Sequence, residues 1–91
     1  MSLGLDEIFS SRGRVRVLLA LFRLGEANIT RIVRETGMHH RIVATHLEKL
    51  VEAGLAVEKR YGRLRIFRIN YSNPKTIIVR DLLEVLSGEQ P

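Results

Sequence analysis

The stretch from Thr30 to Leu55 constrains the fold more than any other, because it is patterned as two short helices joined by a tight turn. Gly37 follows the first helix, at the place where a helix ends best on a residue that tolerates positive φ. In the second helix, Val43, Leu47 and Leu50 recur at spacings of four and three, which predicts one buried face. The opposite face carries polar side chains, namely His39, His40, Arg41, Thr45 and Glu48. A second helix that buries one side and presents polar groups on the other is typical of a helix-turn-helix.

A further helix is predicted before this stretch, from Arg12 to Leu24. Its apolar residues fall on two faces, so we expect it to be buried on more than one side. The first face holds Val15, Leu18, Leu19 and Phe22, and the second holds Val17, Leu21 and Leu24. One face should meet the helix-turn-helix core, and the other should meet a partner, most simply a second copy of the chain.

The starts of these helices leave alternatives open. A short lead-in helix is expected from Leu5 to Phe9, and either Ser10 or Ser11 caps the helix that follows. Asn28 and Thr30 are both suitable caps for the first helix of the helix-turn-helix.

After Gly54 the apolar pattern changes from a helical period to alternation, which predicts two strands. The segment Tyr61-Gly62-Arg63 lies between them as a hairpin turn, and a short strand is expected at 26–29. A β-hairpin directly after a helix-turn-helix makes a winged helix. The stretch Lys59 to Arg68 of this hairpin is basic and has no acid; its cations are Lys59, Arg60, Arg63, Arg65 and Arg68.

The chain should end in a helix of about residues 74–87, with Asn73 as its cap, Pro74 at its first position and Gly88 as its stop. Its apolar residues are Ile77, Ile78, Leu82, Leu83, Val85 and Leu86, more than one small domain needs from a terminal helix. We therefore predict a homodimer joined by the first and last helices. The expected interface residues are Val17, Leu21, Leu24, Ile78, Leu82, Val85 and Leu86.

Length and composition fit this scheme. A chain of 91 residues predicts one domain, residues 1–91, with its core at about 10–70 and an α+β, mostly helical fold. There is no cysteine, hence no disulfide and no thiolate metal site. No apolar run is long enough to span a membrane and no signal peptide is evident, which predicts a cytoplasmic protein without a membrane partner. The net charge of +5 favours a polyanion partner, most often nucleic acid.

The run NITRIVRETGMHHRIVATHLEKLVEAGLAVEKRYGRLRIFRI resembles the winged-helix core of ArsR-type and MarR-like transcription regulators of bacteria and archaea. The resemblance extends from about Ser10 to Ile69 and implies DNA binding. Metal-sensing ArsR-type members carry cysteine ligands on the first helix of the DNA-binding motif, and the corresponding segment 28–31 has none. Metal sensing therefore does not carry over, no cofactor is expected, and the sequence identifies no effector.

His39, His40 and Arg41 lie where a recognition helix contacts base edges, and Arg41 suits guanine. The alternative is an ordinary solvated helix start. A metal site built from these histidines and His46 is disfavoured, since neighbouring helix positions do not face each other. His46 is instead expected to pack near the wing.

The wing cations could grip phosphates, with Arg63 reaching the minor groove, or could be a solvated strand edge. The basic start of the first helix, at Arg12, Arg14 and Arg16, has the same two explanations. The predicted DNA contacts are His39, His40, Arg41, Thr45, Lys59, Arg60, Arg63, Arg65 and Arg14.

The sequence thus predicts a homodimeric, sequence-specific regulator that binds double-stranded DNA. The alternative is a winged helix that serves as a protein–protein interaction module, which should expose an apolar patch on its third helix. An enzyme is not expected, because no nucleophile–base pattern or glycine-rich phosphate loop can be placed.

Overall fold

The computed structural model describes residue 8 and residues 11–87. Helix α2 (Arg12–Leu24) begins at Ser11, whose Oγ accepts a hydrogen bond from the Arg14 N–H at 3.1 Å. Helix α3 (Ile29–Thr36) begins at Asn28, whose Oδ1 accepts from the Arg31 N–H at 2.9 Å. Ser11 and Asn28 are therefore the caps. The predicted lead-in helix lies outside the described residues except for Ile8, which is helical and buried.

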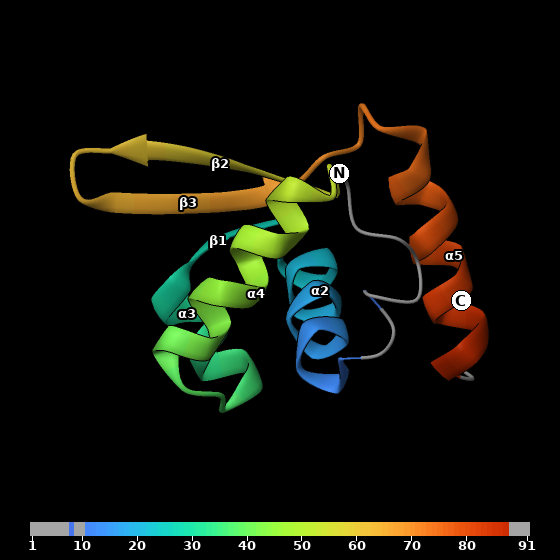
Figure 1. The fold of residues 1–91 in the computed structure, drawn as a ribbon, viewed down its shortest axis with the longest axis horizontal. Helices are drawn as coiled ribbons and strands as arrows, with labels where there is room; N and C mark the ends of the chain where they lie inside the picture. Colours follow the sequence, from blue (N-terminus) through green and yellow to red (C-terminus); the bar gives the residue numbers. More distant parts are fainter. Residues whose placement is uncertain (1–7, 9–10, 88–91) are drawn as a thin grey trace.

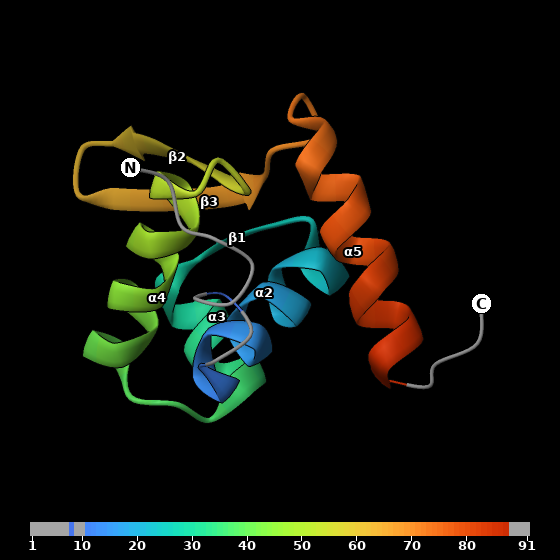
Figure 2. The same cartoon turned by 45° about the vertical axis from the view of Figure 1, so that its right-hand side comes forward.

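Helix α4 (His40–Glu52) follows α3 after a short turn and completes the helix-turn-helix (Figure 1). Three antiparallel strands form one sheet in the order β1-β3-β2. Their bounds are β1 (Glu26–Asn28), β2 (Ala56–Tyr61) and β3 (Leu64–Ile69). The β2–β3 hairpin turns at Gly62, which has φ 62° as a tight two-residue turn requires. Figures 1 and 2 show this wing projecting from the side of the molecule opposite α5.

Helix α5 (Pro74–Ser87) is tied to the end of α4 by Asn73. The Asn73 Oδ1 accepts from the Lys75 N–H at 3.0 Å, so Asn73 caps α5 as predicted. Its Nδ2 donates to the Gly54 carbonyl, also at 3.0 Å. The predicted order of helix, short strand, two helices, hairpin and helix is confirmed, and so is the winged helix-turn-helix fold. In the part of the chain that the structure describes, no helix is long and apolar enough to cross a bilayer.

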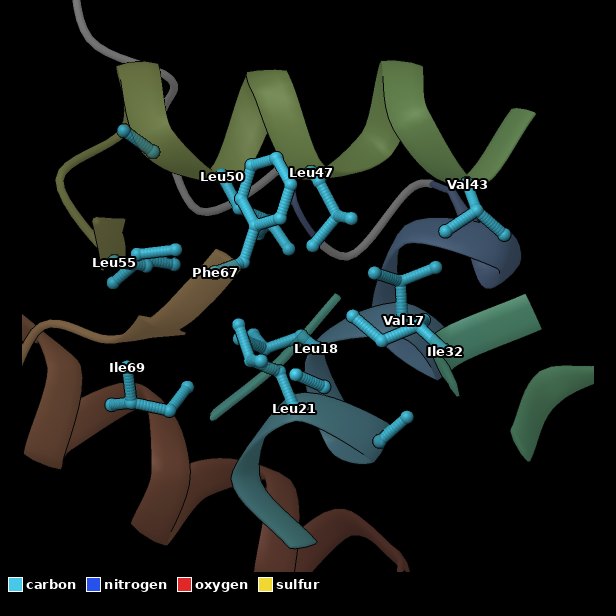
Figure 3. Packing of buried hydrophobic residues seen from close by; sticks show 14 of the residues in the cluster. Val17, Leu18, Leu21, Ile32, Val43, Leu47, Leu50, Leu55, Phe67 and Ile69 are labelled. Carbon is cyan, nitrogen blue, oxygen red and sulfur yellow. The ribbon is translucent and has the colours of Figure 1, made fainter. Parts of the chain in front are cut away.

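The core lies where α2, α3, α4 and the base of the wing meet (Figure 3). Its labelled members in that view are Val17, Leu18, Leu21, Ile32, Val43, Leu47, Leu50, Leu55, Phe67 and Ile69. Val17 and Leu21 have no exposed surface, so the prediction that they face a second subunit is wrong. They belong to the chain's own core because α2 turns this side toward α4 and the sheet. The partly exposed side of α2 holds Val15, Leu19 and Phe22 instead.

Candidate nucleic-acid interface

The start of α4 is capped by a histidine. His39 has extended backbone angles, and its Nδ1 accepts a hydrogen bond from the Arg41 N–H at 3.2 Å. An accepting Nδ1 on a neutral imidazole leaves the proton on Nε2. The exposed ring therefore presents a donor to solvent, which suits a phosphate oxygen or a base acceptor.

The outer face of α4 combines a cation, a hydroxyl and one apolar side chain. Arg41 and Thr45 are exposed, and the Thr45 Oγ1 donates to the Arg41 carbonyl at 3.1 Å. The hydroxyl proton is thus occupied, while its lone pairs can still accept from a base amino group. Ile42 is 51% exposed and was missed from the sequence. A helical projection identifies it, because Ile42 lies about 100° away from the stripe that begins at Val43.

The wing tip and the start of α4 lie on opposite sides of one groove. This groove of about 230 Å³ brings Arg63 from the turn and His40 from α4 to one surface. The groove is lined by Asn28, Ile29, Thr30, His40, Arg63, Leu64 and Arg65. Two predicted DNA contacts that are distant in the sequence therefore share one surface, and the exposed start of α3 adjoins them.

Two of the wing arginines are bonded to carboxylates within the chain. The Arg65 Nε donates to Glu58 Oε2 at 2.7 Å, and its Nη2 donates to Glu48 Oε2 at 3.3 Å. The more exposed Arg60 donates its Nε to Glu58 Oε2 at 2.9 Å. Hydrogen bonding from Arg65 lowers the pKa of Glu58, and the same pair raises the pKa of Arg65. The guanidinium of Arg65 is thus engaged by two acids within the chain, and its role as a direct phosphate contact stays a prediction.

The basic start of α2 also has an internal explanation. Arg16 donates from Nη2 to the Thr36 carbonyl at the end of α3, where a cation is favoured. Arg14 is half-buried near His46, and its role as a DNA contact stays a prediction. Desolvation, followed by the charge of Arg14, lowers the pKa of His46.

His46 packs against α2 rather than near the wing, which corrects the predicted position. A Cβ atom added at Gly13 would come within 2.8 Å of His46 Nε2 and 2.9 Å of the Met38 methyl group. Only glycine fits there without a shift, so Gly13 permits the close approach of α2 to α4.

The metal chemistry of thiolate-ligated regulators does not fit this chain. It has no cysteine, and within residue 8 and residues 11–87 no group of three or more potential ligands could hold an ion.

The outer surface of α5 exposes large apolar side chains beside the acids Asp81 and Glu84. Ile78, Val85 and Leu86 are 64%, 75% and 66% exposed, while Leu24 and Leu82 are half-buried. A groove of about 320 Å³ adjoins this surface between α2 and α5. It is lined by Leu19, Phe22, Arg23, Tyr71, Arg80 and Glu84.

Comparison with known proteins gives a consistent result. Residues 11–58 match the family model described as bacterial regulatory protein, arsR family. Among solved structures, the AntR antimony-specific transcriptional repressor superposes with a TM-score of 0.77 at 25% identity, covering 91% of this chain and 73% of its own. No curated protein sequence matches the chain.

Two further structures share the fold. One is the homodimeric winged helix-turn-helix DNA-binding domain of a possible ArsR-family regulator from Mycobacterium bovis, with a TM-score of 0.72, 24% identity and coverage of 92% and 75%. The other is the transcriptional repressor BigR from Xylella fastidiosa, with a TM-score of 0.72, 18% identity and coverage of 88% and 79%.

Proposed function

Because the chain belongs to the ArsR family of bacterial regulatory proteins, we propose that it is a sequence-specific transcription regulator that binds double-stranded DNA as a homodimer. Helix α4 enters the major groove, with Arg41 and Thr45 directed at base edges. The wing lies on the flanking backbone or in the minor groove, where Arg63 is attracted to a narrow groove.

The observation that carries this proposal is the joint surface of α4 and the wing. His40 and Arg63 line the same groove, and Arg41 lies on the adjoining exposed turn of α4. An interaction module should instead present an apolar patch on α4. Ile42 is the only large apolar side chain that α4 exposes among the described residues, and a single one suits a thymine methyl group.

The dimer is supported by α5. Its outer surface exposes Ile78, Val85 and Leu86, and clustered apolar side chains of this kind mark interfaces. The related domain from Mycobacterium bovis is described as homodimeric. A two-fold dimer joined through α5 would place two α4 helices roughly 34 Å apart, one turn of DNA.

Salt dependence tests the proposal. Duplexes recovered from a random library by the purified protein provide the specific probe, and a scrambled duplex of equal composition provides the control. Each phosphate neutralised should contribute a slope of about −0.9 in log K against log salt. We expect a steep slope on both duplexes and tighter binding to the recovered one. Affinity that barely changes from low to physiological salt would refute the proposal.

A further inference from the structure

Glu48 is an unexpected residue for a surface that binds DNA. It follows Arg41 and Thr45 by seven and three positions, so the three side chains lie along one exposed face of α4. A carboxylate on that face repels phosphates. Its Oε2 accepts a hydrogen bond from Arg65 of β3 at 3.3 Å, so the acid is engaged by the wing.

Arg65, on β3, connects its own strand to β2 and to α4. Its Nε and Nη2 donate to both carboxylate oxygens of Glu58 on β2, at 2.7 and 3.2 Å. Nη2 also reaches Glu48 on α4, and the guanidinium carbon lies 5.2 Å from the centre of the buried Phe67 ring. The side chain is only 23% exposed. Such a fork-shaped, stacked cation has a fixed orientation, which a flexible surface pair lacks.

The position of this cluster along the wing is informative. Strand β1 supports β3 only as far as the pair Asn28 and Ile66, and Arg65 is the next residue toward the tip. Arg65 lies directly opposite Arg60 on β2. Two cations facing each other would push the strands apart, but Glu58 accepts from both. The cluster therefore holds the hairpin together where the support of β1 ends.

We propose that Arg65 is a positioning residue that, together with Glu48 and Glu58, clamps the wing at a fixed angle to α4, so that both elements reach DNA together. The functional part of this inference rests on the proposed DNA binding. Arg65 acts through the wing and does not itself neutralise a phosphate.

A distance measurement on the free protein tests the clamp without DNA. The chain has no cysteine, so spin labels can be attached at Tyr61→Cys on the wing and Glu52→Cys on α4, both exposed positions. Labelled chains are diluted with unlabelled ones so that distances within one chain dominate. The distance distribution between the two labels is measured by electron–electron double resonance. We expect Glu48→Gln to broaden this distribution. Lys49→Gln is the control because it removes a charge from α4 outside the clamp, and its ion-pair partner Glu52 is already replaced by the label in every sample. An unchanged width in Glu48→Gln would overturn the clamp.

Binding assays then test its consequence. Glu48→Gln removes a negative charge, so electrostatics alone predicts tighter DNA binding. The clamp predicts a roughly threefold to tenfold loss on the recovered duplex, with the salt slope unchanged. Glu52→Gln is the matched control, since Glu52 is exposed on α4 and forms its ion pair with Lys49 of the same helix. Gain of affinity in both variants would contradict the clamp. A broadened distance distribution with no DNA binding at all would leave the clamp standing and reject the proposed function instead.

Substitutions at Arg65 distinguish a positioning role from a phosphate contact. Arg65→Gln should lower affinity for the recovered duplex without changing the salt slope, whereas loss of a phosphate contact would make it shallower by about 0.9. Arg65→Lys should recover only part of the loss, because a lysine cannot donate a fork to Glu58 while reaching Glu48. A slope that becomes shallower in Arg65→Gln but not in Arg65→Lys, which keeps the charge, would return Arg65 to the phosphate contacts.

Discussion

Helices α4 and α5 have nearly equal lengths, 13 and 14 residues, and bury similar stripes. In α4 the buried residues are Val43, Leu47 and Leu50, and in α5 they are Thr76, Val79 and Leu83. Their outer faces differ in kind. The face of α4 is polar except for Ile42 and carries Arg41 near its start, whereas α5 exposes three large apolar side chains, Ile78, Val85 and Leu86, beside its acids.

This difference shows that the buried face of a helix fixes its place in the fold, while the outer face indicates what it meets next. An exposed cation such as Arg41 gains free energy by neutralising a phosphate or bonding a base. An apolar outer face gains about 25 cal/mol for each Å² removed from water. The proposed function therefore assigns the outer face of α4 to DNA and that of α5 to a second copy of the chain.

The largest effect on stability is expected from a substitution on the buried face of one of these helices. Leu47→Ala should lower the free energy of unfolding by about 2–5 kcal/mol, since Leu47 is fully buried between α4 and the core. Denaturant unfolding measures this change, with the exposed-side variant Lys49→Ala as control. Equal losses in the two variants would mean that the core is not organised around α4.

Val85→Glu should separate the subunits, because it places a charge on the most exposed apolar position of α5. We choose Val85 over the half-buried Leu82, since a charge at Leu82 would also disturb the monomer. The dimer should weaken by at least about 2 kcal/mol, roughly thirtyfold. Sedimentation equilibrium measures the change, and Ser72→Glu adds the same charge on an exposed loop as control. A wild-type protein that is already monomeric at micromolar concentration would refute the role given to α5.

Arg41→Ala tests the outer face of α4. If Arg41 reads a base, its loss should cost roughly 1–3 kcal/mol on the recovered duplex and much less on the scrambled one. Fluorescence anisotropy on both duplexes measures the difference. Equal losses of affinity on the two duplexes would mean that Arg41 contacts the DNA backbone and does not read a base.

Arg63→Ala should act differently from Arg41→Ala. A phosphate contact at the wing tip adds affinity on any sequence, so its loss should weaken both duplexes alike and make the salt slope shallower by about 0.9. A salt titration of the variant measures this slope. Loss confined to the recovered duplex would assign sequence reading to the wing.

The smallest expected effect is the response of stability to pH at the contact between α2 and α4. The folded state holds the pKa of His46 below its usual value of 6.5 through desolvation and Arg14. The unfolded chain therefore binds a proton first as pH falls, and stability should decline below about pH 6.5. Denaturant unfolding across this range should show a shallower decline in His46→Gln. The pKa of Glu58 is lowered from 4.5, so its own contribution is lost only at lower pH.

Much of the fold follows from local patterns in the sequence. The spacing of Val43, Leu47 and Leu50, the Asn73 cap and the alternation around Gly62 each depend on neighbouring residues, and each was predicted. For the caps of α2 and α3 the sequence left two candidates each. The errors and omissions concern contacts between distant residues. Nothing local shows that Val17 and Leu21 are covered by the chain itself, that His46 meets Gly13, or that Arg65 bonds to Glu58 and Glu48. A basic run in a strand looks the same whether its cations face solvent or an acid on a neighbouring helix.

The most direct test of the account compares the recovered duplex with its scrambled control at physiological salt and counts the chains on each by sedimentation. We expect the recovered duplex to bind at least about 10³-fold more tightly. We also expect two chains on it, one for each half-site. Equal affinity for the two duplexes, or a single chain on the recovered duplex, would contradict the assignment of α4 to DNA and α5 to the second subunit.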